Sequence, residues 1–167
     1  MANTDFPSGA IPIKYKNGKS LQNEVATISA TNAAIYPGDT LELHTDGYAR
    51  VIETTTPTKV LGVAAEYKAA NSGGEVNYYP AQDLVFRMQG DGSDIDAQTD
   101  FDLTYAITNT TGDTTTLRSK QEIDTDATDA TDYPVIIRKV ASTQDYVANA
   151  LGANVELICE FNDDVIF

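Results

Sequence analysis

The sequence predicts a small all-β protein, a β-barrel or β-sandwich with an extended N-terminal arm and at most one short helix. Of its 167 residues, 41% are hydrophobic, which is enough to close one core. Thr occurs at 21 positions and Tyr at nine, and both residue types favour strands. Apolar and polar side chains also alternate with a period of two along most of the chain, as in half-buried strands.

Residues 1–24 are expected to form the arm. The segment Phe6–Ile13 contains two prolines and a glycine, which excludes a helix and favours an extended path along another surface. The arm carries a net charge of +1, whereas residues 25–167 carry −15. This asymmetry is typical of a tail that docks on an acidic surface, and a disordered, solvated terminus is the alternative.

Five arm residues are the candidate contacts with a partner. We expect Ile11 and Ile13 to occupy apolar grooves, and Lys14, Lys16 and Lys19 to lie near acidic groups.

The first half of the body predicts six short strands separated by turn signals. Their expected positions are 25–28, 41–45, 48–52, 60–67, 75–79 and 84–89. Asp46-Gly47 is the sharpest local signal, since glycine tolerates the positive φ angles of a tight hairpin turn. Such spacing is typical of a small barrel or sandwich rather than of β-α-β units.

The second half alternates less regularly. We expect strands at 101–107, 114–117, 135–140 and 155–161, and a short helix over 143–151 that ends at Gly152. Residues 25–167 are expected to form one domain, with two lobes at about 25–90 and 91–167 as a variant of this arrangement.

Charge and hydropathy restrict the classes of partner. A net charge of −14 repels phosphate backbones and anionic lipid headgroups. No apolar run reaches the length of a spanning helix, and the first residues lack the features of a signal peptide. We therefore expect a soluble protein made in the cytoplasm, without nucleic-acid or membrane binding.

Few residues are suited to catalysis, and we expect no enzyme and no cofactor. His44 is the only imidazole and lies on the polar face of its strand. Cys159 is the only thiol, and we expect it to be buried beside Val155, Leu157 and Phe161.

Acidic residues and tyrosines leave two binding alternatives open. The clusters 91–96 and 126–132 are expected to be solvated loops, with calcium as the alternative, although the EF-hand pattern fails at Thr99 and Tyr105. Four tyrosines could line a glycan platform, but half-buried sheet positions are the usual place for them: Tyr78, Tyr79, Tyr105 and Tyr133.

The chain ends on the apolar residues Val165, Ile166 and Phe167. Exposed apolar residues at a free end are unfavourable in water, so we expect an edge-strand extension or a clip that docks on a partner.

The order of several motifs resembles the head decoration, or capsid cement, proteins of tailed bacteriophages. The motifs are Ile35–Leu43, Asp46–Ala49, Val60–Ala64, Gly74–Val76 and Phe86–Gln89, followed by Asp102-Leu103, Thr111-Gly112 and a closing strand from Val155 to Asn162. The resemblance covers about residues 30–162. It implies a non-enzymatic, β-rich structural protein of the virion that binds the major capsid protein on the outside of the shell, often as a trimer.

The expected function is therefore stabilisation of a phage capsid. A tail-associated or glycan-binding β module is the alternative.

Overall fold

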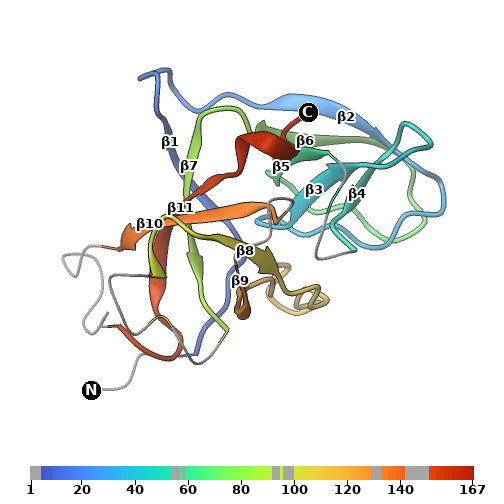
Figure 1. Cartoon of the computed structure of the whole chain (residues 1–167). Coiled ribbons are helices and arrows are strands. Elements are labelled where there is room, and N and C mark those ends of the chain that lie inside the picture. Colours follow the sequence, from blue (N-terminus) through green and yellow to red (C-terminus); the bar gives the residue numbers. More distant parts are fainter. Residues whose placement is uncertain are drawn as a thin grey trace.

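The computed structural model describes residues 5–53, 57, 59–91, 95, 100–128, 133–141 and 151–167. Strands dominate these residues, so the all-β prediction is confirmed (Figure 1). The expected helix over 143–151 lies almost entirely outside the described residues.

Five strands close into a barrel in the order β2-β4-β3-β5-β6. They are β2 (Glu24–Ile28), β3 (Thr40–Leu43), β4 (Ala49–Val51), β5 (Val60–Ala64) and β6 (Gly74–Pro80). The turn at Asp46-Gly47 joins β3 to β4 as predicted, with Gly47 at φ 84° and the His44 amide donating to Tyr48 O at 3.0 Å. The parallel pair β2–β4, at Ile28 and Ala49, closes the barrel.

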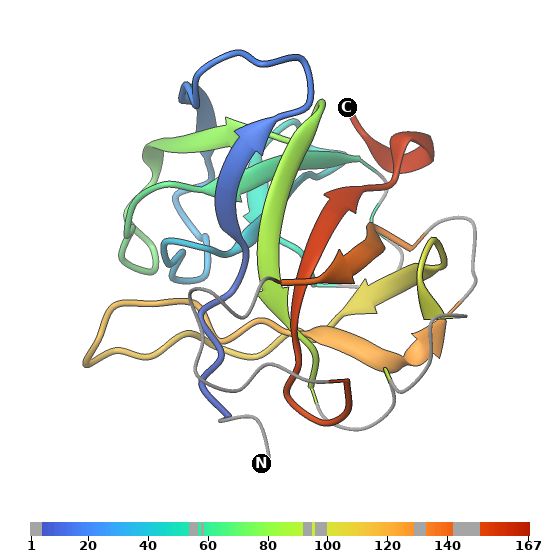
Figure 2. The same cartoon turned by 90° about the vertical axis from the view of Figure 1, so that its left-hand side faces the viewer.

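A six-stranded antiparallel sheet in the order β1-β7-β11-β10-β8-β9 packs beside the barrel (Figures 1 and 2). Its strands are β1 (Ile11–Tyr15), β7 (Leu84–Gln89), β8 (Thr104–Ile107), β9 (Ile123–Thr128), β10 (Val135–Val140) and β11 (Glu156–Phe161). A 3-10 turn, η2 (Asp163–Val165), follows β11. The sheet takes β1 and β7 from the first half of the chain. Residue 90 therefore does not separate the strands of the barrel from those of the sheet.

The hydrophobic core lies inside the barrel and between the barrel and the sheet. Leu41 and Val76 are fully buried within the barrel. The larger cluster joins barrel residues such as Val60 to the inner face of the sheet, where the Phe86 and Phe161 ring centroids are 4.5 Å apart. The larger cluster thus ties the barrel to the sheet, and the smaller one fills the barrel.

The arm is not separate from the folded body. β1 pairs antiparallel with β7, and Ala10 and Tyr15 are buried in the shared core. This pairing alters the expected boundary at residue 24. The two prolines are compatible with it, because Pro7 precedes β1 and Pro12 lies on an edge strand, where proline is tolerated.

Two expectations in the second half are wrong. Residues 114–117 form the tip of a loop rather than a strand, because Asp113 Oδ1 accepts hydrogen bonds from the amides of Thr115 and Thr116. The segment 123–128, expected to be partly a solvated acidic loop, is strand β9, with Ile123 and Thr125 facing the interior. Strand β8 also begins at Thr104 rather than at residue 101.

The loop from β8 to β9 locks against the barrel through buried polar groups. Gln121 Oε1 accepts from the Thr40 amide at 2.7 Å, and the Ser119 amide donates to Pro37 O at 3.2 Å. Asp39, 2% exposed, accepts from the Tyr36 amide at 2.8 Å and from Ser119. Burial raises the pKa of Asp39 to about 6, partly offset by these hydrogen bonds.

Candidate functional site: a basic groove on the outer face of the sheet

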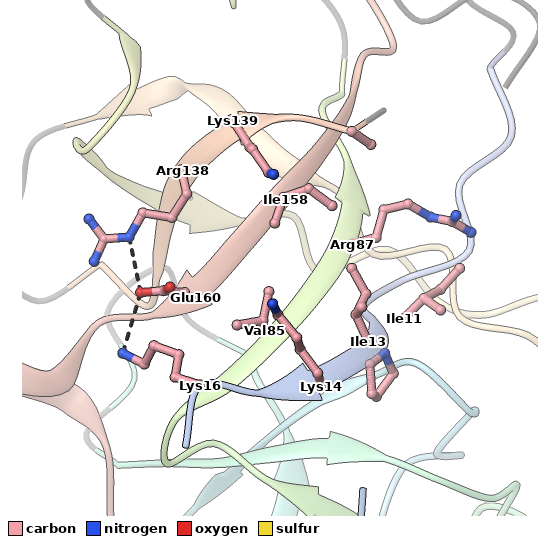
Figure 3. A pocket seen from close by; sticks show the side chains of 12 residues that line it. Ile11, Ile13, Lys14, Lys16, Val85, Arg87, Arg138, Lys139, Ile158 and Glu160 are labelled. Atoms are coloured by element: carbon pink, nitrogen blue, oxygen red, sulfur yellow. Dashed lines mark hydrogen bonds and ion pairs between the residues drawn. The ribbon is translucent and has the colours of Figure 1, made fainter. Parts of the chain in front are cut away.

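A groove of about 780 Å³ crosses the outer face of β1, β7, β11 and β10 (Figure 3). We call it the sheet groove. Its walls carry five of the 11 Lys and Arg residues of the chain: Lys14, Lys16, Arg87, Arg138 and Lys139. Among the described residues, Glu160 is the only carboxylate that lines it. A local excess of positive charge therefore lies on a protein whose net charge is −14.

Strand alternation explains which side chains reach the sheet groove. On β7, Leu84 and Phe86 face the core, so Val85 and Arg87 point outward. On β11, the inward side chains of Leu157 and Cys159 likewise leave Ile158 and Glu160 on the outer face.

The edge strand β1 completes the groove. Its register places Ile11 opposite Arg87 and Lys14 opposite Val85, with an irregularity between Pro12 and Lys14. Ile13 is 44% exposed and adds apolar surface to the rim of the groove.

The floor of the sheet groove is apolar. Val85 is 6% exposed, and Ile11 and Ile158 are half-buried. Figure 3 shows Val85 and Ile158 between the basic side chains of β1 and β10. A ligand on this floor would bury aliphatic surface and meet cations on both sides.

Three of the five cations are paired with carboxylates. Glu160 receives Lys16 Nζ at 3.4 Å and Arg138 Nε at 3.0 Å, as the dashed lines in Figure 3 show. Arg138 also contacts Asp102 at 2.7 Å, and Arg87 Nε lies 3.2 Å from Glu156. Burial raises the pKa of Glu156, and Arg87 lowers it in part.

Lys14 and Lys139 differ from the other three. Both are exposed, and within the described residues neither has a carboxylate within 4.0 Å. The register places Lys14 opposite Val85 and Lys139 opposite Ile158, so both ammonium groups lie beside the apolar floor.

The structure brings four of the predicted contact residues together in the sheet groove: Ile11, Ile13, Lys14 and Lys16. Lys19 lies elsewhere, at a smaller hollow beside Tyr15 and Gln22. Sequence reasoning missed Arg87, Arg138 and Lys139 as members of the site. The alternation of β7 indicates that Arg87 points outward. Which side chains lie beside Arg87 depends on how the strands pair, and the local pattern does not show this.

The C-terminal residues pack on their own barrel. Val165 is buried in the shared core, and Ile166 forms a parallel bridge with Val60. The Phe167 amide donates to Val60 O at 3.1 Å, and its ring, 67% exposed, lies beneath Lys59 Nζ. The tail thus pairs with Val60 at the start of β5, and Phe167 is the most exposed of the three residues.

The tyrosines do not form one exposed platform. Tyr78 and Tyr105 are buried, with their hydroxyls donating to Glu24 Oε2 at 3.1 Å and Asp100 O at 2.7 Å. Burial raises the pKa of each to about 12, and nearby acidic groups add to the shift. Tyr79 and Tyr133 are half-buried.

The two candidate catalytic residues, Cys159 and His44, lie in different parts of the fold. Cys159 is fully buried in the cluster that holds Val155, Leu157 and Phe161, as predicted, and burial raises the pKa of its thiol. His44 lies in the exposed hairpin, with Nδ1 3.3 Å from Asp46 Oδ1. Within the described residues no three His, Cys, Asp or Glu side chains are grouped to hold a metal ion. Much of the clusters 91–96 and 126–132 lies outside those residues.

No protein-family model, curated protein or solved structure matches this chain. In the portion that the structure describes, no helix has the length and apolar character needed to cross a membrane.

Proposed function

We propose that this protein is a structural protein of a tailed-phage virion, which binds the major capsid protein on the outer surface of the shell and stabilises it. The observation that supports this most is the sheet groove, where five of 11 cations surround an apolar floor on an otherwise acidic molecule. An apolar centre with a charged rim is the usual anatomy of a protein-binding surface.

The distribution of charge suits attachment on one side only. The sheet groove offers cations to an acidic surface. The rest of the molecule carries nearly all of the 25 Asp and Glu residues, and their negative charge keeps decorated particles from aggregating. The virion exterior is the proposed location, after synthesis in the host cytoplasm, and a homotrimer is the proposed assembly. Spreading of contacts over several capsid subunits would raise the effective concentration of each contact.

Co-sedimentation with capsid shells of the phage that carries this chain tests the proposal. Removal of residues 1–19 is unsuitable, since it would delete β1 and the buried Ala10 and Tyr15. The double variant K14E/K139E instead reverses the two charges of the sheet groove that have no carboxylate within 4.0 Å among the described residues. The control R118E/K120E makes the same change in net charge at two residues outside the groove, the exposed Arg118 and the half-buried Lys120.

Wild-type protein and the R118E/K120E control should sediment with shells at sub-micromolar concentration, and K14E/K139E should require at least about tenfold more protein, equivalent to about 1.4 kcal/mol. Absence of wild-type binding to shells would refute the proposed function. Equal binding by both variants would remove the sheet groove as the attachment surface.

A further inference from the structure

Glu160 already shows how the sheet groove holds a carboxylate. Its side chain, 15% exposed, lies between Lys16, which follows β1, and Arg138 on β10 (Figure 3). One carboxylate therefore bridges the two rims of the groove. The rest of the rim offers the same chemistry to a carboxylate that arrives from outside.

Lys14 and Lys139 are the cations left for such a ligand. Each projects beside an apolar residue of the floor, Val85 or Ile158, and no carboxylate of the described chain neutralises it. A ligand with negative charges at two points and aliphatic groups between them would satisfy both features.

The floor and the net charge favour an acidic peptide over a polyphosphate. Both arginines of the groove already face carboxylates, Arg87 at Glu156 and Arg138 at Glu160, so two guanidinium forks suited to phosphate are occupied. A net charge of −14 also repels a nucleic-acid strand more strongly than a short segment with a few carboxylates.

We infer that the sheet groove binds an extended acidic segment of a partner protein, in which aliphatic side chains alternate with Asp or Glu, and that Glu160 acts as an internal competitor for it. Alternation places the aliphatic side chains on Val85 and Ile158 and the carboxylates on the opposite face of the segment, where the exposed side chains of Lys14 and Lys139 can extend to them from the two rims. This inference rests on the proposed function and names the chemistry of the shell segment that the groove receives.

A titration followed by ¹H–¹⁵N correlation spectra tests the inference on the full chain without capsids. The probe is a blocked peptide of alternating Asp and Ile, and the comparison ligands are the matching Lys and Ile peptide and an oligothymidylate. The acidic peptide should shift amides of β1, β7, β11 and β10, and the two comparison ligands should leave them in place.

Three variants sharpen the test, and their spectra also report whether each one is folded. K14E/K139E should weaken binding of the acidic peptide at least about tenfold, whereas R118E/K120E should bind as the wild type does. E160Q should bind about threefold more tightly, because Lys16 and the Nε side of Arg138 lose their carboxylate partner and can receive the ligand, while Arg138 Nη1 stays paired with Asp102. A purely structural role for Glu160 would change stability and leave the affinity for the peptide unaltered.

Four results would overturn the inference: no shifts in the groove, equal shifts with the Lys peptide, stronger binding of the oligothymidylate, or no gain for E160Q. Shifts that appear on raising the protein concentration alone would assign the groove to a second copy of the chain, which also overturns it. Shell binding without peptide binding refutes only this inference, whereas peptide binding without shell binding refutes only the proposed function.

Discussion

The buried carboxylate of Asp39 should make the protein less stable at neutral pH than at mildly acidic pH. Asp39 is 2% exposed, and its hydrogen-bond donors are the Tyr36 amide and Ser119, both uncharged. Burial without a cation raises its pKa from 3.8 to about 6. The folded state therefore binds this proton more tightly than the unfolded state does.

The magnitude follows from linkage between protonation and folding. A difference of about two pKa units corresponds to about 3 kcal/mol. Because the folded pKa is the higher one, this contribution to stability is present in full below pH 3.8 and is lost as the pH rises through about 6. The carboxyls of Glu42, Glu122 and Glu156 are shifted in the same direction, so the wild-type profile alone does not isolate Asp39.

The variant D39N isolates the effect. Asn keeps an acceptor for the Tyr36 amide and can donate to Ser119, but it has no charge to bury. The free energy of unfolding, measured in urea by circular dichroism from about pH 4 to about pH 8, should favour D39N increasingly as the pH rises, by about 3 kcal/mol across the full transition.

Asp113 supplies the control of opposite sign. Hydrogen bonds from the amides of Thr116 and Thr115 lower its pKa below 3.8. With the measurement extended below about pH 4, D113N should therefore become relatively less stable as the pH rises from the lowered pKa of Asp113 to 3.8. A stability difference between D39N and wild type that stays constant with pH would refute the burial of an ionisable Asp39 at the junction of barrel and sheet.

Four further outcomes are expected of the fold. Gly62→Ala should destabilise the fold strongly, since the added Cβ would collide with the Tyr79 carbonyl oxygen. Gly47→Ala places its Cβ in open space and should cost only about 1 kcal/mol of unfolding free energy, because of the positive φ at this position. Similar losses for both variants would contradict the pairing of β5 with β6. Leu157→Ala should cost about 2–5 kcal/mol of unfolding free energy, and a loss below about 1 kcal/mol would be inconsistent with its place in the shared core. Cys159 should react with a thiol reagent only after unfolding, and rapid labelling of the native protein would disprove its burial. Far-ultraviolet circular dichroism should show well under about a quarter helix, and a larger share would disprove the all-β fold.

Alternation predicted the strands in which apolar residues face the core. β7 and β11 follow it closely, since Phe86 and Leu157 are buried while Arg87 and Ile158 face the groove. Strand β9 was not predicted, because its buried position between acidic neighbours is occupied by a polar residue, Thr125. The Thr125 hydroxyl donates to Asp91. The acidic residues that suggested a loop, Asp124 and Asp126, thus lie on the outward face of a strand.

The site was only partly predictable for a different reason. The arm stood out by its local charge, which led to Ile11, Lys14 and their neighbours. The cations of β10 come from a segment more than a hundred residues away, and only the order β1-β7-β11-β10 brings them to the same groove. Strand order depends on long-range pairing, which local periodicity does not encode.

A density map of phage particles saturated with this protein tests the central claim most directly. We predict that the face formed by β1, β7, β11 and β10 contacts the outside of the shell, with a segment of the capsid protein in the sheet groove between Lys14 and Lys139 and the barrel directed to solvent. A map in which the shell carries no additional density, or in which the sheet groove is open to solvent on bound subunits, would contradict the account.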